Sequence, residues 1–343
     1  MIAVVILNWN GAEMMRRFLP SVVAHTAPEG EVIVADNGST DDSLAMLRSE
    51  FPMVRIVGMP ENLGFAEGYN EVFRRIEAET PSRYDLYLLL NSDVRVTPQW
   101  LRPLRAYMDE HPEVAAAQPK LLAEWANDTF EYAGGAGGFL DRDGYPFCRG
   151  RLLSVVEKDC GQYDDVASLF WATGAALLVR ATDWAATGGL DGRFFAHNEE
   201  IDLCWRLRAR GRKIVCIPQS VVYHVGGGTL PQDNPRKTYL NFRNNLTMLY
   251  KNLPEASLRR VMLRRKVLDA VAALKFLLTG DVANARAVRR ARRDYKAWRK
   301  DFEADRRENL AKITLHSIPE HIDRSLLWAF FAQGRRTFTE FVK

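Results

Sequence analysis

The sequence is poor in cysteine, and its cysteines are not spaced as metal ligands or disulfide partners usually are. The four are Cys148, Cys160, Cys204 and Cys216, and no two of them form a C-x-x-C pair. This spacing is typical of neither a disulfide scaffold nor a zinc ribbon. We therefore expect reduced, buried thiols, as in a cytosolic protein, although Cys148 and Cys160 share one loop-like stretch in which they can pair.

The sequence also lacks a hydrophobic run of the roughly 20 residues that a membrane-spanning helix needs. The longest candidate, residues 267–278, is interrupted by Asp269 and Lys275. Met1 is followed at once by the apolar residues 2–7, without the basic segment of a signal peptide, so we expect a first β-strand there. With 47% hydrophobic and 26% charged residues, the composition predicts a soluble globular protein of one large or two moderate domains.

Excess positive charge is confined to the C-terminal region. Residues 256–307 contain 16 Lys and Arg against 6 Asp and Glu, whereas the net charge of the whole chain is only +4. The rest of the chain is therefore acidic. No nucleic-acid recognition motif accompanies the basic segment, so we expect no nucleic-acid partner.

Short apolar runs alternate with helix-like segments over the first hundred residues, at residues 3–7, 32–35, 54–57 and 86–90. This alternation predicts an α/β fold built on a mostly parallel sheet. Residues 124–167 are rich in Gly, Asp and aromatic residues, and they predict a long loop of the kind that serves as a lid or binding loop. Beyond Pro231 the chain is predicted to be helical to its end.

Two acidic turns follow predicted strands. Asn91-Ser92-Asp93 comes directly after the run at 86–90, and Asp36 opens the other turn. In open α/β sheets the ligand lies just beyond the carboxyl ends of the strands. Asp93 is therefore a candidate cation ligand, and Asp36 is a candidate acceptor for the imide N–H of uracil or thymine. The structural alternative is that both are turn formers or helix caps.

Seven segments follow the order found in one enzyme family: residues 4–11, 36–41, 61–70, 91–93, 173–175, 199–203 and 224–227. Over about residues 1–250 they resemble the inverting nucleotide-sugar transferases of glycosyltransferase family 2, and residues 130–254 look most like bacterial rhamnosyltransferases. The resemblance implies the Rossmann-like GT-A fold. We accordingly expect a GT-A domain at 1–250, with a nucleotide-binding half at 1–120 and an acceptor and catalytic half at 121–250, and a basic helical region at 251–343.

The resemblance also implies a site for a nucleotide-diphosphate sugar. The turn at Gly64 permits close approach of a nucleotide to the backbone, and Asn70 suits a ribose or phosphate. The alternative is a loop that simply enters a helix. Arg243 is expected to contact the diphosphate. The implied donor-binding residues are Leu7, Asn8, Asn10, Asp36, Asn62, Gly64, Phe65, Asn70, Asn91, Ser92, Asp93 and Arg243.

A departing nucleotide diphosphate is anionic, so the transfer needs a divalent cation or several cationic groups. The resemblance implies Mg²⁺ or Mn²⁺ held by Asp93 and completed by His224. The family usually has two aspartates around a variable residue, whereas this chain has Asn91 at the first position. One carboxylate suffices, because Mg²⁺ also binds substrate phosphates and water. Taken in isolation, His224 is more simply a satisfied buried histidine.

Glu199, Glu200 and Asp202 gather at the start of a predicted helix, where the helix dipole favours ionised carboxylates. An inverting transfer needs one carboxylate to take the proton of the acceptor hydroxyl. By position Glu200 matches the family's base, usually aspartate, with Glu199 as the alternative and Asp202 binding the acceptor or orienting the base. Without this context the three form an acidic first turn on a surface helix. The implied acceptor-binding residues are Trp171, Thr173, Gly174, Arg149 and Arg151, of which the arginines suit a pyrophosphate-linked acceptor.

An apolar stripe with basic flanks is predicted in the C-terminal region. Val267, Val271, Leu274 and Leu278 recur at helical spacing among Lys and Arg residues. Such an amphipathic helix can lie on an anionic bilayer. Alternatively, the stripe packs on its own domain and the charges are merely solvated.

The sequence thus predicts a metal-dependent, inverting glycosyltransferase of cell-surface glycan synthesis, in the cytoplasm and peripheral to the inner face of the membrane. The leading donor is dTDP-rhamnose, and the acceptor is a glycan or its polyprenyl-linked precursor. UDP-linked hexose, N-acetylhexosamine or galactofuranose are the alternative donors. A non-catalytic nucleotide- or glycan-binding relative is the alternative from another class, against which the presence of Asp93, Glu200 and His224 together argues.

Overall fold

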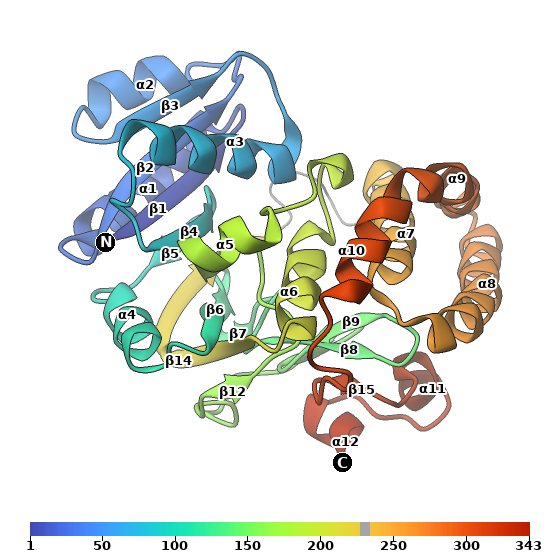
Figure 1. The fold of residues 1–343 in the computed structure, drawn as a ribbon. Helices are drawn as coiled ribbons and strands as arrows, with labels where there is room; N and C mark the ends of the chain where they lie inside the picture. Colours follow the sequence, from blue (N-terminus) through green and yellow to red (C-terminus); the bar gives the residue numbers. More distant parts are fainter. Residues whose placement is uncertain (227–233) are drawn as a thin grey trace.

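The computed structural model describes residues 1–226 and 234–343 (Figure 1). Gly227 of the expected metal-site segment and Pro231, the expected start of the helical region, lie outside these residues. The described part has a 10-stranded main sheet, a second sheet of five strands and a layer of C-terminal helices. The predicted α/β class and the C-terminal helices are therefore confirmed.

The four apolar runs of the first hundred residues form adjacent parallel strands of the main sheet. β1 (Ile2–Asn8) lies between β2 (Gly30–Asn37) and β4 (Leu86–Asn91), and β3 (Arg55–Met59) pairs with β2. The other strands of the sheet's main path are β6 (Val114–Ala123), β12 (Ala167–Ser168), β13 (Ala176–Arg180) and β14 (Lys213–His224). The order is β12-β14-β6-β13-β4-β1-β2-β3, in which β13 is antiparallel to both of its neighbours.

Helices cover both faces of the main sheet, which is why its central strands are apolar on both sides. Val4 and Ile6 enter one core, shared with α1 (Ala12–Thr26), α2 (Ser43–Glu50) and α4 (Leu101–Glu110). Ala3 and Val5 enter the other core, shared with α3 (Gly64–Glu79), α5 (Ala181–Thr187) and α6 (Glu199–Ala209). The polar residues at the strand ends are thus the part of the sheet left for a ligand.

The segment expected to be a long loop contains short strands instead. They are β7 (Ala126–Phe130), β8 (Gly138–Asp141), β9 (Pro146–Cys148), β10 (Arg151–Leu152) and β11 (Val155–Val156). The last four form the second sheet together with β15 (His321–Ile322), which runs parallel to β8. The expectation of a purely helical C-terminal part is therefore wrong at β15. Strands this short show no periodicity, and the partner of β8 is remote in sequence, so no local pattern signals them.

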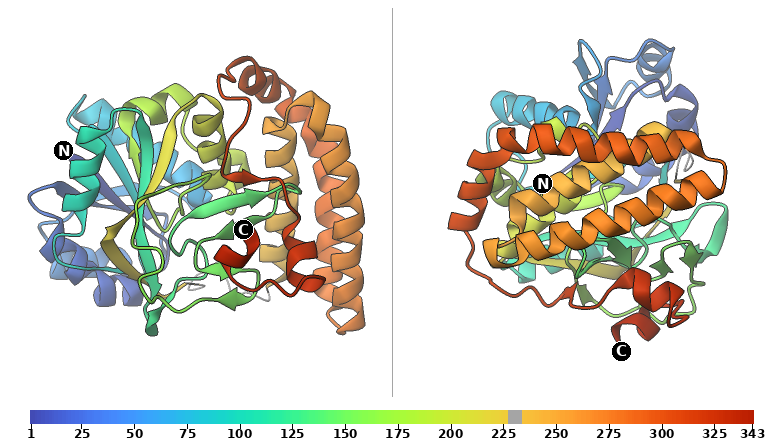
Figure 2. Two further views of the ribbon diagram at one scale, coloured as in Figure 1. Left: turned by 90° about the horizontal axis from the view of Figure 1, so that it is seen from below. Right: turned by 90° about the vertical axis from the view of Figure 1, so that its right-hand side faces the viewer.

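Three long helices form a layer beside the main sheet (Figure 2). α7 (Pro235–Asn252) packs on α6, and α9 (Val282–Trp298) packs on α7. α8 (Glu255–Leu278) lies beside α9 on the outside of the molecule. The expected domain boundary after residue 250 falls inside α7. The division into two domains stays a prediction. Within residues 1–226 and 234–343, no helix combines the length and apolarity needed to cross a membrane.

The four cysteines are unpaired thiols. Cys148, Cys204 and Cys216 are buried as expected, whereas Cys160 is exposed. Burial raises the pKa of Cys148 to about 11 and that of Cys204 and Cys216 to about 12. The buried thiols are therefore protonated and unreactive at neutral pH.

A buried ionic cluster attaches α8 to the rest of the molecule. Asp269 is fully buried and accepts a hydrogen bond from Nε of Arg265 at 3.3 Å and another from the guanidinium of Arg292 on α9. Arg265 also donates to Asn245 of α7 and to the backbone oxygen of Asp143. A cluster of this kind is stable only while each buried charge keeps its partner.

We expect Asp269→Asn to lower the free energy of unfolding by about 3 kcal/mol, because it leaves the Arg265 guanidinium buried without a counter-charge. The measurement is urea unfolding followed by circular dichroism. The matched control is Glu303→Gln, which removes an exposed carboxylate and should change stability by less than about 0.5 kcal/mol. Equal stability of Asp269→Asn and the wild type would show that the cluster does not hold α8.

Candidate active site

The carboxyl ends of β1, β2 and β4 bring predicted donor residues to one edge of the sheet. In the sheet register Asn8 lies opposite Asp36, and Leu7 lies opposite Asn91. Asp36 is buried, and it accepts hydrogen bonds from Nδ2 of Asn8 at 3.2 Å and from the backbone N–H of Ser39 at 3.1 Å. These are the bonds of a turn-forming Asp, so its contact with a nucleobase stays a prediction.

Asn10 joins the turns that follow β1 and β2. Its Oδ1 accepts hydrogen bonds from the backbone N–H groups of Thr40 at 2.7 Å and Asp41 at 3.3 Å. Its own backbone N–H donates to Oγ of Ser39 at 2.9 Å. Two of the seven expected segments are thus locked together at the sheet edge.

The turn before α3 is built by two asparagines. Oδ1 of Asn37 accepts from the backbone N–H of Leu63 at 2.9 Å, and its Nδ2 donates to the backbone oxygen of Gly64 at 3.1 Å. Oδ1 of Asn62 accepts from the N–H of Gly64 at 2.8 Å. Gly64 has a φ of +80°, and a Cβ there would lie 2.5 Å from the ring of Phe195, so no other residue fits. Asn37 was not among the predicted site residues.

The segment from Thr173 to Ala175 joins the end of β4 to the start of α6. The backbone N–H of Asn91 donates to the oxygen of Ala175 at 3.0 Å. A Cβ at Gly174 would lie 3.1 Å from the ring of Phe65 and 3.8 Å from Cβ of Glu200. This short segment therefore places the predicted donor residue Phe65, the predicted base and the acidic turn after β4 in one neighbourhood.

Asp93 and His224, the two predicted metal ligands, lie side by side. β14 pairs with β5 (Val94–Val96) through His224 and Val94, and Nε2 of His224 lies 3.1 Å from Oδ1 of Asp93. Nδ2 of Asn91 lies 3.4 Å from the same nitrogen. The other ring nitrogen, Nδ1, is 3.2 Å from Oε1 of Glu131, a buried carboxylate that was not predicted.

The charges around His224 are strongly coupled. Burial disfavours the imidazolium, but the Glu131 and Asp93 carboxylates outweigh it and raise the pKa of His224 to about 10. Burial in turn raises the pKa of Asp93, and the hydrogen bond with His224 more than offsets this and lowers it. Among residues 1–226 and 234–343, no three His, Cys, Asp or Glu side chains are grouped to hold a metal ion. Asp93 and His224 are therefore a pair of side chains available to bind a cation, and coordination by them stays a prediction.

Glu199 and Glu200 begin α6 in surroundings that favour their protonated forms. Burial raises the pKa of Glu200 to about 7. Burial and the nearby charge of Glu200 raise the pKa of Glu199 well above its usual range. Oε2 of each side chain is buried without a hydrogen-bond partner. A carboxylate poised near pH 7 with a free oxygen is suited to accept a proton.

Asp202 is occupied by structural bonds. It is fully buried, and its Oδ2 accepts from Nε of Arg206 at 3.0 Å and Nζ of Lys251 at 2.9 Å. Its Oδ1 accepts from Nδ2 of Asn252 at 2.8 Å. Asp202 therefore joins α6 to α7, and its predicted role of binding the acceptor or orienting the base stays a prediction.

The other predicted acceptor residues are held mainly by protein partners. Nε1 of Trp171 donates to the backbone oxygen of Phe139 at 2.9 Å, and the N–H of Thr173 donates to Oε1 of Gln118 at 3.0 Å. Arg149 forms an ion pair with Asp165, and Arg151 donates to the backbone oxygen of Leu153. Both arginines are buried, and Nη1 of Arg149 and Nε of Arg151 lack hydrogen-bond partners. Their contact with an acceptor stays a prediction.

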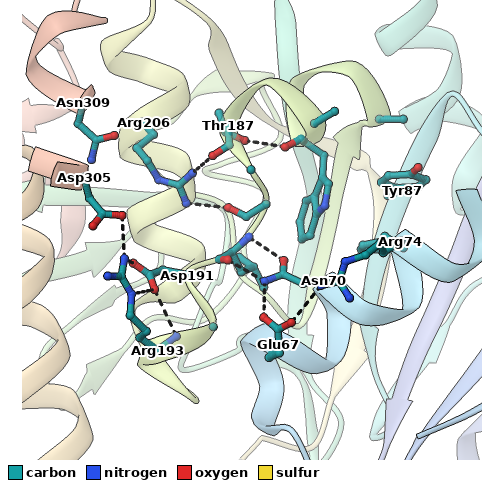
Figure 3. A pocket seen from close by; sticks show the side chains of 18 of the residues that line it. Glu67, Asn70, Arg74, Tyr87, Thr187, Asp191, Arg193, Arg206, Asp305 and Asn309 are labelled. Atoms are coloured by element: carbon teal, nitrogen blue, oxygen red, sulfur yellow. Dashed lines mark hydrogen bonds and ion pairs between the residues drawn. The ribbon is translucent and has the colours of Figure 1, made fainter. Parts of the chain in front are cut away.

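Asn70 lies away from the Asp93 and His224 pair. Its Nδ2 donates to the backbone oxygen of Leu190 at 2.8 Å, and its Oδ1 accepts from the N–H of Leu190 at 3.0 Å. It faces a cavity of 940 Å³ between α3, α5, α6 and α10 (Glu303–Ala311), whose lining includes neither Asp93, His224 nor Glu200 (Figure 3). Asn70 thus joins α3 to the segment after α5, and its contact with a nucleotide stays a prediction.

Arg243 projects from α7 and packs against the end of α9. Its guanidinium lies 4.2 Å from the centre of the Trp298 ring, and its Nη2 donates to the backbone oxygen of Phe194 at 3.2 Å. Contact of Arg243 with a diphosphate stays a prediction.

The loop before α6 has an unusual backbone that the sequence did not signal. Phe195, His197 and Asn198 have φ values between +68° and +74°, a region that side chains other than glycine adopt at a cost. Nδ2 of Asn244 on α7 donates to three backbone oxygens of this loop, those of Phe194, Ala196 and His197, at 2.8–3.0 Å. Asn244 therefore maintains the conformation from which Glu199 and Glu200 project.

We expect Asn244→Ala to lower the free energy of unfolding by about 2 kcal/mol and to speed amide exchange in residues 194–199, because it leaves carbonyl groups unpaired. Urea unfolding and hydrogen-exchange mass spectrometry measure the two effects. Thr238→Ala on the same helix is the control, since among the described residues the Thr238 side chain makes no hydrogen bond to the loop, and the change should cost about 0.5 kcal/mol. If Asn244→Ala and the control exchange alike in this loop, Asn244 does not hold it.

Comparison with known proteins agrees with this geometry. Residues 3–150 match the family model described as glycosyl transferase family 2. The chain is 27% identical over 239 residues to N-acetylglucosaminyl-diphospho-decaprenol L-rhamnosyltransferase of Mycobacterium tuberculosis, covering 64% of this chain and 75% of that protein. It is 23% identical over 231 residues to rhamnosyltransferase WbbL of Escherichia coli, covering 65% and 83%.

Solved structures share the fold at lower identity. A crystal structure of S. aureus TarS 1-349 aligns with a TM-score of 0.52 and 12% identity over 97% of this chain and 92% of that one. GalNAc-T7 with UDP, GalNAc and Mn²⁺ aligns with a TM-score of 0.52 and 16% identity, over 65% of this chain and 43% of that one. The chain therefore has the GT-A fold, carries a glycosyl transferase family 2 region at residues 3–150 and resembles bacterial rhamnosyltransferases.

Proposed function

We propose that the protein is an inverting, metal-dependent glycosyltransferase that transfers L-rhamnose from dTDP-rhamnose to a hydroxyl of a cell-surface glycan or its polyprenyl-linked precursor. The choice of sugar and acceptor is supported by the rhamnosyltransferases that the chain resembles, one of which is described as acting on N-acetylglucosaminyl-diphospho-decaprenol. The free thiols suit a reducing compartment, so we place the reaction in the cytoplasm.

One observation carries the proposal: the segment from Thr173 to Ala175 connects the candidate base with the acidic turn after β4. Its Ala175 oxygen holds the backbone of Asn91, and its Gly174 packs closely against the ring of Phe65 and beside Cβ of Glu200. Phosphate-bound and hydroxyl-bearing substrates that meet beside this segment would have their reacting atoms between a cation site and a base.

Glu200 is the group that we assign to the acceptor proton. Its pKa of about 7 and its unpartnered Oε2 suit a general base working near neutral pH. Glu199 stays protonated beside it, because burial and the charge of Glu200 raise the pKa of Glu199 well above its usual range. Asp202 holds the helix that carries both of them.

Asp93 and His224 would hold the divalent cation, Mg²⁺ or Mn²⁺. The donor set fits, because one carboxylate, one imidazole nitrogen and substrate phosphate oxygens form an ordinary site for such ions. When bound, the cation would offset the charge that develops on the nucleotide diphosphate. Glu131 faces the remote nitrogen of His224, which would keep Nε2 directed at Asp93 and at the cation.

The first prediction concerns pH. Transfer should rise about tenfold per pH unit below pH 7 and level off above it, since only ionised Glu200 accepts a proton. Sugar transfer between pH 5 and 9, at saturating donor, measures this. The raised pKa has the opposite effect on folding: the folded state binds this proton more tightly, so stability should fall as the pH rises from 4.5 towards 7. A flat rate profile between pH 5 and 7 would contradict the assignment.

The second prediction concerns the cation. Mn²⁺ should strengthen binding of dTDP-rhamnose in the wild type, and Asp93→Asn should remove that dependence. Glu131→Gln should weaken Mn²⁺ binding about 10- to 100-fold by releasing His224. Calorimetry with dTDP- and UDP-sugars, with Mn²⁺ and then with chelator, measures both effects and identifies the nucleotide.

The control for the cation experiment is Asp301→Asn, which removes an exposed carboxylate on the short helix after α9 and should change nothing. Tight binding of a UDP-sugar in preference to dTDP-rhamnose would keep the enzyme class and change the donor. Binding of no donor by the wild type would favour the non-catalytic alternative and contradict the proposal.

A further inference from the structure

The outer face of α8 is a continuous apolar surface. Six side chains on it are 51–79% exposed: Leu263, Val267, Val271, Leu274, Leu277 and Leu278. We call these six residues the α8 stripe. They follow one another at helical spacing along about four turns of α8, and this helix lies on the outside of the molecule, away from the main sheet (Figure 2). The alternative that this stripe packs on its own domain is therefore wrong.

The burial on α8 is reversed relative to an ordinary surface helix. Its buried residues are Val261, Arg265 and Asp269, two of which are charged. Arg265 and Asp269 pair with each other, and Asn245 and Arg292 make further hydrogen bonds to them, so the inner face already has its partners within the chain. Surface helices normally turn their apolar stripe to the core and their charges to water. The exposed apolar stripe is thus not needed for packing within the chain.

Exposed positive charges border the α8 stripe. On α8 itself they are Arg259, Arg260, Lys266 and Lys275. Only two acidic residues occur on this helix: Asp269, which is buried, and Glu255 at its first turn, which is paired with Arg306. The neighbouring helix α9 adds the exposed basic residues Arg286, Arg289 and Lys296, whereas its Arg290 and Arg293 are paired with Asp294. An apolar centre with basic borders matches the boundary between acyl chains and anionic headgroups.

We propose that the α8 stripe docks on an anionic lipid bilayer, with its Leu and Val side chains in the headgroup and acyl boundary and the bordering Lys and Arg at the phosphates. A second copy of this chain is less suited to cover the stripe. Two-fold pairing of the stripe would place the basic borders of one copy against the basic borders of the other. A nucleic acid would pair with the charges and leave the apolar centre in water. This surface is separate from the proposed transfer reaction, and neither depends on the other.

The test is cosedimentation of the full chain with vesicles of phosphatidylcholine containing 30% phosphatidylglycerol, and with phosphatidylcholine alone. The wild type should bind the anionic vesicles at low salt and lose most of its binding in high salt. Val271→Ser with Leu274→Ser should lower the partition coefficient at least about tenfold. Lys266→Ser with Lys275→Ser should lower it about 25-fold, at about fivefold per cation.

The controls remove the same kinds of side chain elsewhere. Met53→Ser with Trp125→Ser takes away two exposed apolar side chains, and Arg48→Ser with Arg102→Ser takes away two exposed cations. Both pairs should bind vesicles as the wild type does. Binding of dTDP-rhamnose is measured for every variant as a separate test of the proposed function. Failure of the membrane proposal can then be distinguished from failure of the proposed function.

Three results would overturn the membrane proposal. One is the absence of binding to anionic vesicles at low salt. Another is equal binding to neutral and anionic vesicles, which would show that the bordering Lys and Arg residues do not contribute to binding. The third is a wild-type dimer in solution that the Val271 and Leu274 variant dissociates, because the stripe would then belong to a second copy.

Discussion

The buried carboxylate of Asp202 joins the two parts of the molecule on which the candidate site depends. It lies in the first turn of α6, two residues after Glu200, and it is neutralised by Arg206 of the same helix and by Lys251 of α7. Lys251 continues the network to Asp191 in the segment after α5. Taking such charges out of water is expensive, so the network persists only while all of its members meet. The start of α6 is therefore fixed by residues about 50 positions further along the chain.

Through this ionic network the C-terminal helices help to position the residues of the candidate site. Asn244 of α7 binds the carbonyls of the loop that precedes α6, and that loop holds three residues other than glycine at positive φ. Strained backbone of this sort persists only where its surroundings impose it. The orientation of Glu199 and Glu200 thus follows from α7, and α7 in turn packs on α9, which carries one end of the cluster that attaches α8.

The same arrangement separates two electrostatic environments within one site. Around His224 the carboxylates of Asp93 and Glu131 favour positive charge, which suits a position for a cation. At the start of α6 burial disfavours negative charge, so Glu200 retains a proton until about pH 7. A transfer from a nucleotide-diphosphate sugar needs both, one to offset the leaving group and one to accept a proton. The segment from Thr173 to Ala175 keeps them adjacent.

The sequence predicted those features that repeat locally or that end a strand. The four parallel strands were predicted because buried runs with intervening helices are periodic. Asp93 was singled out because it follows such a strand and His224 from the family resemblance, and their binding of a metal stays a prediction. Pairing of β8 with β15 was missed, since two-residue strands carry no pattern. The sequence also did not signal the contacts of Glu131 and Asn37 or the structural bonds of Asp202, because their partners are distant in sequence. Composition showed the amphipathic helix but not which side of it faces outward.

The most direct test of the account is single-turnover transfer from dTDP-rhamnose by Glu200→Gln and Glu199→Gln, each with its donor affinity measured beside it. If Glu200 takes the acceptor proton, Glu200→Gln binds donor normally and transfers about a thousandfold more slowly, while Glu199→Gln retains most of the rate. A Glu200→Gln enzyme with normal donor affinity and an undiminished rate would contradict the account.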